Sequence, residues 1–284
     1  MPEGDTIFRT AHTLHRALTG QRVTQFETVL PHLARVEIDS PITGRTIDNV
    51  EARGKWLLIH LSGDLALLTH MLMSGSWHIY RPGERWQRGR IHMRIVLHTE
   101  RILAIAFNVQ VAEFHTATSL ERRAGLTTLG PSLLAPQFDA AKAVARLRSR
   151  PELEIGSALM TQSLLAGVGN VFKSEICFAA NVHPFRLVQS LTDAELAALV
   201  ATARKFLQAN VADLADASTV TYRGFRRTTD RLALDARLWV YDRAGQPCRH
   251  CATPIDSYRQ GPGARTTYWC PRCQSAQSIT TAAR

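Results

Sequence analysis

The chain has 284 residues, enough for one large domain or two of ordinary size. Hydrophobic residues make up 45% and charged residues 20%, which is typical of a soluble globular protein. The 34 lysines and arginines outnumber the 24 aspartates and glutamates, giving a formal net charge of +10. Because cationic side chains release counterions from phosphates, this charge favours a nucleic acid as partner, although a membrane surface would also satisfy it.

The sequence argues against two forms of membrane targeting. It has no stretch of about 18 apolar residues, so no transmembrane helix is expected. Glu3 and Asp5 stand where a signal peptide needs a basic region, and no apolar run follows them. We therefore expect a cytoplasmic protein without a membrane partner.

The first part of the chain predicts one helix followed by many short strands. Apolar residues recur at helical spacing over residues 5–18. Trp56–Leu61 and Leu65–His70 flank a short turn and predict a hairpin. Residues 90–98 alternate and predict a strand, and repeated short strands predict a β-sandwich or β-barrel. The apolar residues expected to share one face of that strand are Ile91, Met93, Ile95 and Leu97.

The apolar period becomes helical after a segment rich in glycine and proline. Helices are predicted over residues 138–147 and 153–165. Asn170 is expected to cap the next helix, because it follows a glycine-containing turn. Thr192 and Glu195 have the spacing of a capping box and predict the start of a further helix.

Four of the five cysteines form two Cys-x-x-Cys pairs, preceded by an alternating segment at residues 231–241. The gap of about 18 residues between the pairs suits a four-cysteine zinc site, and a reducing compartment favours metal over disulfides. Four thiolates leave no position for water, so the zinc is expected to be structural. The polar residues between the pairs, which include prolines and glycines, predict a β-ribbon. The four expected ligands are Cys248, Cys251, Cys270 and Cys273.

The N-terminal residues offer a second candidate chemistry. Removal of Met1 would leave Pro2 with a secondary amine, and amines attack carbonyl carbons to form Schiff bases. An α-amine has a pKa of about 7.7–8.0, against about 10.4 for lysine, so more of it is unprotonated at neutral pH. Glu3 is available for proton exchange. Taken alone, the same residues also suit an ordinary frayed terminus.

Five blocks of sequence follow one another in an order that resembles a known family. The chain resembles the formamidopyrimidine-DNA glycosylase and endonuclease VIII family from residue 2 to about residue 274, and most of all the endonuclease VIII-like members that begin Met-Pro-Glu-Gly-Asp-Thr. The blocks are Met1-Pro2-Glu3-Gly4, Ala52–Leu58, His70–Trp77, Gln162–Glu175 and Arg265–Cys273.

The resemblance implies a multi-domain α+β fold. An N-terminal β-sandwich with an N-terminal helix would precede a helix-two-turn-helix domain and a C-terminal β-ribbon zinc finger. We expect these boundaries: a catalytic β-sandwich domain at 1–124, a linker at 125–137, the DNA-binding helical domain at 138–230, the zinc ribbon at 231–276 and a tail at 277–284.

The resemblance also implies catalytic roles. Pro2 would attack C1′ of a damaged nucleotide, and Glu3 would donate a proton. Lys55 would assist at the same sugar and phosphate, and Arg265 would contact phosphates and take part in the last elimination step. From the residues alone, Lys55 remains a solvated strand lysine and Arg265 a surface arginine on a hairpin tip.

Further DNA contacts are implied at four positions. Asn170, Tyr241 and His70 would contact the DNA backbone, and Met73 would fill the space left when the base is flipped out of the helix. The alternatives are an ordinary helix cap for Asn170, a core-edge aromatic for Tyr241, a satisfied strand-end histidine for His70 and core packing for Met73.

The chain departs from the family pattern at several positions. Asp5 and Thr6 replace a proline and a carboxylate that most relatives have, which leaves the proton relay around Pro2 open. The void-filling loop of the Asp-Pro-Arg-Arg-Phe type is absent, and residues 106–110 take its place. Gly156 stands where the formamidopyrimidine branch often has lysine.

The resemblance implies a bifunctional DNA glycosylase and abasic-site lyase of base excision repair, with structural zinc and no redox cofactor. We expect a nucleoid-associated monomer that binds damaged double-stranded DNA, with single-stranded DNA as an alternative substrate. Oxidised pyrimidines and oxidised purines both remain open, since residues 219–231 match neither branch. Two other classes also remain: a non-catalytic zinc-ribbon protein that binds nucleic acid, and a translation-associated zinc protein.

Overall fold

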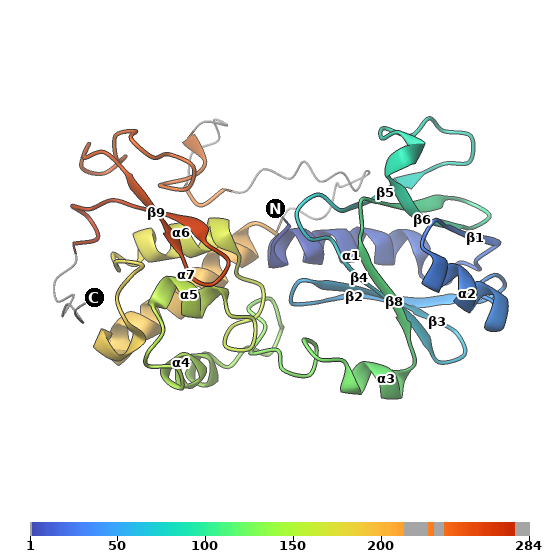
Figure 1. Ribbon diagram of the computed structural model, residues 1–284, viewed down its shortest axis with the longest axis horizontal. Helices are drawn as coiled ribbons and strands as arrows, with labels where there is room; N and C mark the ends of the chain where they lie inside the picture. Colours follow the sequence, from blue (N-terminus) through green and yellow to red (C-terminus); the bar gives the residue numbers. More distant parts are fainter. Residues whose placement is uncertain (1, 213–226, 230–235, 276–284) are drawn as a thin grey trace. The chain divides into compact units, whose positions relative to one another are not determined.

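The computed structural model describes residues 2–212, 227–229 and 236–275, and the segment 219–231 and the expected tail therefore lie largely outside it. The chain divides into two compact units, which are treated separately below (Figure 1). Unit 1 extends to Thr127 and also includes Val211 and Ala212, which follow the Asn210 end of the first part of unit 2. Unit 2 begins at Thr128 and includes the described residues from 227 onward.

Unit 1 contains two four-stranded antiparallel sheets, as expected for a β-sandwich. One sheet has the strand order β2-β3-β4-β8 and the other the order β1-β6-β7-β5. The predicted hairpin is confirmed, since β3 and β4 pair from Trp56↔His70 to Leu61↔Leu65. The strands are β1 (Gln25–Thr28), β2 (Ile47–Arg53), β3 (Trp56–Leu61), β4 (Leu65–His70), β5 (Ser76–Tyr80), β6 (Met93–His98), β7 (Leu103–Phe107) and β8 (Val111–His115).

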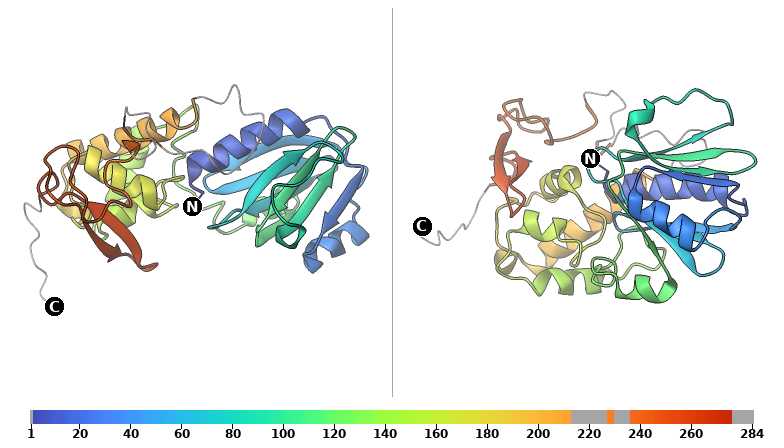
Figure 2. Two further views of the ribbon diagram at one scale, coloured as in Figure 1. Left: turned by 90° about the horizontal axis from the view of Figure 1, so that it is seen from above. Right: turned by 45° about the vertical axis from the view of Figure 1, so that its right-hand side comes forward.

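Helix α1 (Gly4–Leu18) packs against β2 and β3 and completes the core of unit 1 (Figures 1 and 2). Its buried apolar residues are spaced by three or four positions, so they form one stripe along the helix. That stripe joins a hydrophobic cluster made by both sheets. Its residues are Ile7, Ala11, Leu14 and Leu18.

Unit 1 also departs from the sequence expectation. Helix α2 (Pro31–Asp39) occupies a region where only strands were expected; it starts with proline at its first turn and buries only Leu33. A short helix α3 (Ala117–Arg122) follows β8.

The strand expected at residues 90–98 begins only at Met93. Residues Arg90–His92 form a 3₁₀ turn, η1, and Ile91 is 82% exposed instead of facing the core. Two contacts fix this turn: the Asn108 N–H donates to the His92 carbonyl, at 2.8 Å, and the Arg94 guanidinium donates to the Ile91 carbonyl, at 3.0 Å. The bond between Asn108 and His92 joins residues 16 positions apart, so alternation within residues 90–98 did not reveal it.

Unit 2 is helical and ends in a β-hairpin. None of the helices in the described part of the chain has the length and apolar character needed to cross a membrane. Residues 236–241, part of the segment expected to alternate as a strand, form turns and bends. The elements are α4 (Ala140–Arg148), α5 (Ile155–Met160), α6 (Asn170–Ala179), η2 (Val188–Ser190), α7 (Asp193–Ala209), β9 (Asp256–Gln260) and β10 (Arg265–Trp269).

Helix α5 is shorter than the helix predicted over residues 153–165. The Gln162 side chain explains the difference, because its amide donates to the carbonyls of Met160 and Val168, at 2.8 and 3.0 Å, and accepts from the Gly167 N–H at 3.0 Å. These bonds replace the helical pattern with a closed loop before α6.

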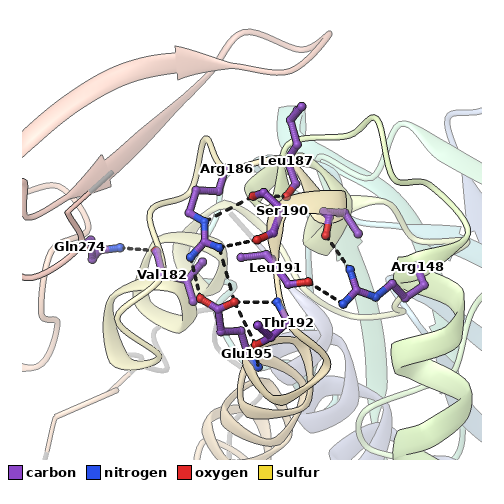
Figure 3. A network of polar contacts seen from close by, with 10 residues as sticks. Arg148, Val182, Arg186, Leu187, Ser190, Leu191, Thr192, Glu195 and Gln274 are labelled. Carbon is purple, nitrogen blue, oxygen red and sulfur yellow. Dashed lines mark hydrogen bonds and ion pairs between the residues drawn. The ribbon is translucent and has the colours of Figure 1, made fainter. Parts of the chain in front are cut away.

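The capping box at the start of α7 is confirmed. Thr192 accepts from the Glu195 N–H at 3.2 Å, and the Glu195 carboxylate accepts from the Thr192 N–H at 2.7 Å. The same carboxylate binds the Arg186 guanidinium at 2.6 Å (Figure 3). Figure 3 also shows the Gln274 amide donating to the Val182 carbonyl, at 2.8 Å, which joins the chain after the second cysteine pair to the segment that follows α6.

Replacement of Leu14 by alanine tests the packing of α1. Leu14 is fully buried, so Leu14→Ala is expected to lower the free energy of unfolding by about 2–5 kcal/mol. Ile38→Ala is the control, since Ile38 is 77% exposed on α2 and should change stability by less than about 0.5 kcal/mol. Urea unfolding followed by circular dichroism measures both; equal losses would contradict the assignment of α1 to the core.

Candidate active site and zinc site

One edge of the unit 1 sandwich collects several of the expected catalytic residues. The strand register places Arg53, Trp56, His70 and Val111 in one row across the first sheet. The β2–β3 turn and the segment after β4 therefore leave the sheet at the same edge. Lys55 lies in that turn, and His70 is the last residue of β4.

Helix α1 brings the N-terminus to this edge. Its C-terminal end lies at the start of β2, because the Gly20 N–H donates to the Ile47 carbonyl at 2.8 Å. The two elements run antiparallel, and 15 helical residues span about the same length as the seven residues of β2. The N-terminus of α1 therefore lies near the end of β2 that leads into Lys55. Pro2 and Glu3 are both buried there, and Glu3 has no exposed surface.

Lys55 lies in a tight turn, not within a strand as the sequence suggested. Arg53 and Trp56 pair, so Gly54 and Lys55 form a two-residue hairpin turn. Gly54 has φ +61°, the left-handed conformation that glycine adopts without strain. The turn holds the Lys55 backbone on a rigid hairpin.

His70 is fixed as a neutral hydrogen-bond donor. Its ring packs edge-on against Trp56, with 4.8 Å between centroids, and Nδ1 accepts from the Leu72 N–H at 3.0 Å. Burial lowers the pKa of His70, and the nearby Lys55 ammonium lowers it further. With Nδ1 as acceptor, the neutral ring has its proton on Nε2.

The apolar run after His70 divides between the core and the surface. Met71 is buried, whereas Met73 is 55% exposed. The loop closes tightly, because the Gly75 N–H donates to the Met71 carbonyl at 2.8 Å, and a Cβ at Gly75 would lie 2.5 Å from that oxygen. Leu72 has φ +49° within it. The core-packing alternative therefore applies to Met71 and not to Met73.

The unusual pair Asp5 and Thr6 lies in the first turn of α1. Asp5 is 3% exposed, and the Thr6 hydroxyl donates to its carboxylate at 3.3 Å. The chain thus has a buried carboxylate beside Glu3, although not at the position where most relatives have one.

In unit 2, the structure brings Asn170 and Arg265 close together. Asn170 is the first residue of α6, and its side-chain amide donates to the Thr266 carbonyl at 2.9 Å. Arg265, the preceding residue, starts β10 and is exposed. The expected role of Asn170 as a helix cap is wrong, since Gly169 occupies the cap position. The Asn170 side chain instead joins the helix to the hairpin.

The sequence analysis did not identify the role of Glu175. Its buried carboxylate accepts from the N–H groups of Trp239, Val240 and Tyr241, at 2.7, 2.9 and 2.8 Å, and from the Thr228 hydroxyl. Burial raises the pKa of Glu175, while these hydrogen bonds act in the opposite direction. Glu175 therefore positions the backbone of Tyr241, and the signal for it was an acidic residue inside the apolar run of α6.

A second buried charge, also missed, supports the hairpin. Lys173 is 1% exposed and donates to the Thr267 hydroxyl at 2.5 Å. Thr267 donates to the side-chain carbonyl of Gln260 at 2.9 Å, and the Gln260 amide donates to Glu154 at 3.0 Å. A Cβ at Gly156 would lie 2.4 Å from the Gln260 side chain, so Gly156 leaves room for this chain of contacts.

The four C-terminal cysteines fit a structural zinc ion. Their sulfur atoms all lie within 4.8 Å of one another, and the Cys251 sulfur lies 3.4 Å from that of Cys270 and 3.5 Å from that of Cys273. A tetrahedron with Zn–S bonds of about 2.3 Å has sulfur–sulfur edges of about 3.8 Å. The β9–β10 hairpin connects the two cysteine pairs, as predicted, and is drawn in red in Figure 2. Cys248 and Cys270 share a hydrophobic cluster with Phe178 of α6. Cys177 lies outside the cluster and is buried.

Replacement of one zinc ligand tests the metal site. The unsubstituted protein should contain about one zinc ion per chain. Cys270→Ser should contain far less than one, because three thiolates hold the ion more weakly than four. Cys177→Ser is the matched control and should keep its zinc, since Cys177 is not in the cluster. Metal analysis of the purified proteins gives the answer; full zinc content in Cys270→Ser would contradict the assignment.

Replacement of Glu175 tests the support of Tyr241. Glu175→Gln places an amide group against backbone N–H donors and should lower the free energy of unfolding by about 3 kcal/mol. Glu152→Gln, which removes an exposed carboxylate from the same unit, should change stability little. Urea unfolding of both variants decides the matter, and an unaffected Glu175→Gln protein would show that the buried carboxylate is dispensable.

Family models for three consecutive domains match the chain. The formamidopyrimidine-DNA glycosylase N-terminal domain matches residues 1–110, and the formamidopyrimidine-DNA glycosylase H2TH domain matches residues 129–222. A zinc finger found in formamidopyrimidine-DNA glycosylase and isoleucyl-tRNA synthetase matches residues 245–276.

Individual proteins agree with these matches. The chain is 39% identical to a probable endonuclease 8 of Streptomyces coelicolor, covering 97% of this chain and 94% of that protein. It is 36% identical to a DNA-(apurinic or apyrimidinic site) lyase of Mycolicibacterium smegmatis, covering 97% and 100%. Its fold is similar to that of the Lactococcus lactis formamidopyrimidine-DNA glycosylase solved with abasic-site DNA, with a TM-score of 0.79, 22% identity and coverage of 96% and 99%. The chain belongs to the formamidopyrimidine-DNA glycosylase and endonuclease VIII family.

Proposed function

We propose that this chain is a bifunctional DNA glycosylase and abasic-site lyase that removes oxidised bases through a covalent intermediate on Pro2. The observation that carries this proposal is the burial of Pro2 and Glu3 at the start of α1, at the sheet edge that also holds Lys55 and His70. An amine and a carboxyl group next to each other supply a nucleophile and a proton donor.

The helix itself favours the reactive form of the amine. The N-terminus of a helix has a partial positive charge, so it disfavours a protonated Pro2 and favours the neutral amine. The Pro2 nitrogen attacks C1′, the glycosidic bond breaks, and its electron pair leaves with the base, which takes a proton from Glu3. The C1′–O4′ bond of the sugar then breaks, O4′ takes up the proton lost from the Pro2 nitrogen, and the nitrogen lone pair forms a double bond to C1′. The resulting iminium ion makes the C2′ proton acidic. Loss of the C2′ proton expels the phosphate from C3′, and a second elimination expels the phosphate from C5′.

The remaining site residues are proposed to bind the DNA backbone. The neutral His70 ring donates from Nε2 to a phosphate, and Lys55 lies at the same edge of unit 1. In unit 2, Asn170, Arg265 and Tyr241 serve the same purpose on elements held together by Lys173, Glu175 and the zinc cluster. The net charge of +10 supports binding to a polyanion, and a protein that binds DNA in this way is expected at the nucleoid.

Met73 is proposed to replace the flipped base in the stack. A flipped nucleotide leaves a gap in the helix, and apolar side chains commonly fill such gaps. Met73 is exposed on a tightly closed loop at the end of β4. We propose oxidised pyrimidines as the preferred substrates, because the first six residues resemble the start of the endonuclease VIII-like members of the family, and this resemblance implies oxidised pyrimidines.

Borohydride trapping on an abasic-site duplex tests the proposal. The protein with a free Pro2 should give a covalent product, and a variant with one extra residue before Pro2 should give none, because its amine is acylated. Absence of a trapped product with the unmodified protein would favour the non-catalytic class.

Replacement of Glu3 separates the two activities. Glu3→Gln should slow base excision by about 10²–10⁴-fold, because it removes a general acid, while cleavage of a preformed abasic site is affected less. Single-turnover rates on duplexes that contain an oxidised pyrimidine, an 8-oxoguanine or an abasic site measure this and rank the substrates. Equal losses on all three would argue against Glu3 as the proton donor to the base.

A further inference from the structure

The segment between β5 and β6, residues 81–92, is named here the arginine arm. It contains four arginines and a single acidic residue, Glu84. The Glu84 carboxylate is engaged locally, accepting from the Arg81 N–H at 2.9 Å. The arm is therefore a concentrated positive charge on the surface of unit 1. The arginines are Arg81, Arg85, Arg88 and Arg90.

Trp86 anchors the arm to the outer face of the second sheet. Its ring stacks on Tyr80, with 6.5 Å between centroids, and meets Phe107 edge-on at 5.9 Å. The Gln87 N–H donates to the Tyr80 hydroxyl at 3.0 Å. Together with Met93, Val96 and Ile105, these aromatic residues form a small hydrophobic cluster separate from the main core. These contacts hold the arm in one arrangement, so the arm loses less conformational entropy when it binds a partner.

A buried polar chain beneath the arm adds to this support. His78 is 3% exposed and lies between the Ser76 and Tyr80 hydroxyls, at 3.0 and 2.9 Å. Burial and the nearby Arg88 lower the pKa of His78 to about 4, so the ring is neutral at physiological pH. The charge of Arg88 is therefore near an uncharged ring.

The arginines of the arm differ in what they contact. The Arg90 guanidinium lies over the Trp86 ring at 5.8 Å and 3.5 Å from the Glu27 carboxylate. Among the described residues, Arg81, Arg85 and Arg88 form no ion pair with a carboxylate. Arg85 is exposed and Arg88 half-exposed, so both guanidinium groups are available to an anionic partner.

The arm returns to the sheet edge from which Met73 projects. Ser76, Phe107 and Met93 lie in one row, because Ser76 pairs with Phe107 and Phe107 with Met93. The Met73 loop, which precedes Ser76, and the end of the arm, which precedes Met93, therefore leave the second sheet at the same edge. Neighbouring strands lie about 4.8 Å apart, so only about 10 Å separates the two strands concerned.

We infer that Arg85 and Arg88 bind phosphates of duplex DNA outside the segment held at the lesion. This inference rests on the proposed function, which brings DNA to the Met73 edge. Guanidinium groups bind phosphates strongly, and evenly spaced anions require no shaped pocket. An acidic peptide would need an apolar anchor for stable docking, but Trp86 faces the sheet and is not available for that purpose.

The salt dependence of DNA binding tests the inference. Two duplexes with a central tetrahydrofuran abasic-site analogue are compared, one of about one helical turn (about 10 base pairs) and one of about two and a half turns. Affinity falls as salt rises, so the slope of log affinity against log salt is negative. On the long duplex, the double variant Arg85→Gln/Arg88→Gln should make this slope shallower by about 2 between about 50 and 200 mM salt, because two phosphate contacts are lost. On the short duplex its slope should equal that of the unsubstituted protein.

Two further variants make the test specific. Arg22→Gln/Arg101→Gln removes the same charge from exposed positions at the end of the second sheet opposite Met93, and should leave the slope on the long duplex unchanged. Trp86→Ala removes no charge but frees the arm, and should weaken binding of the long duplex. An unaltered melting temperature of unit 1 in Arg85→Gln/Arg88→Gln confirms that its fold is intact.

Three outcomes would overturn the inference: an unchanged slope on the long duplex, equal losses on both duplexes, or a loss matched by the Arg22→Gln/Arg101→Gln control. If Arg85→Gln/Arg88→Gln keeps the slope on the long duplex but binds a polyglutamate peptide more weakly than the unsubstituted protein does, the partner of the arm is an acidic protein instead. Borohydride trapping is measured in parallel on a duplex of the short length that contains a natural abasic site, because the tetrahydrofuran analogue has no aldehyde carbon with which an amine can react. If the unsubstituted protein traps no product, the proposed function fails, whereas normal trapping with an unchanged slope rejects the arm alone.

Discussion

The packing of α1 against the sandwich is the constraint on which the candidate active site depends. Three turns of apolar side chains, from Ile7 to Leu18, fix the helix on β2 and β3. Because the helix runs antiparallel to β2, this packing also fixes its first residues, and Pro2 and Glu3 are buried at the edge where Lys55 and His70 emerge. Chain termini are usually mobile, and a nucleophile at a terminus is useful only when it is held in place.

In unit 2, buried charged side chains hold the candidate DNA-binding residues in place. Glu175 collects three consecutive backbone N–H groups around Tyr241, and Lys173 reaches the hairpin through Thr267. Buried charges are costly unless they are hydrogen-bonded, and here each is hydrogen-bonded to the segment that it positions. The cysteine cluster closes the base of the same hairpin, so helix α6, the hairpin and Arg265 form one supported surface.

The arginine arm shows how a surface charge can be given a fixed position. Its aromatic anchor belongs to a cluster on the outer face of the second sheet, away from the main core. The chain lacks the void-filling loop of the Asp-Pro-Arg-Arg-Phe type. The Met73 loop, at the sheet edge to which the arm returns, is therefore the proposed element that enters the DNA stack. Contacts by the arm to flanking phosphates would hold the duplex against that edge without adding to base recognition.

Local patterns in the sequence were sufficient for the β3–β4 hairpin, the capping box of α7 and the zinc ligands, because each depends on a few residues close together in the chain. The family resemblance supplied Pro2, Glu3, Lys55 and Arg265 as candidates, but not their surroundings. Tertiary structure alone decided that Ile91 is exposed, that Asn170 joins α6 to the hairpin instead of capping the helix, and that Glu175 holds the backbone of Tyr241. These features depend on contacts between residues far apart in the sequence, and the free energy of such contacts is set by burial and hydrogen bonding that no local spacing encodes.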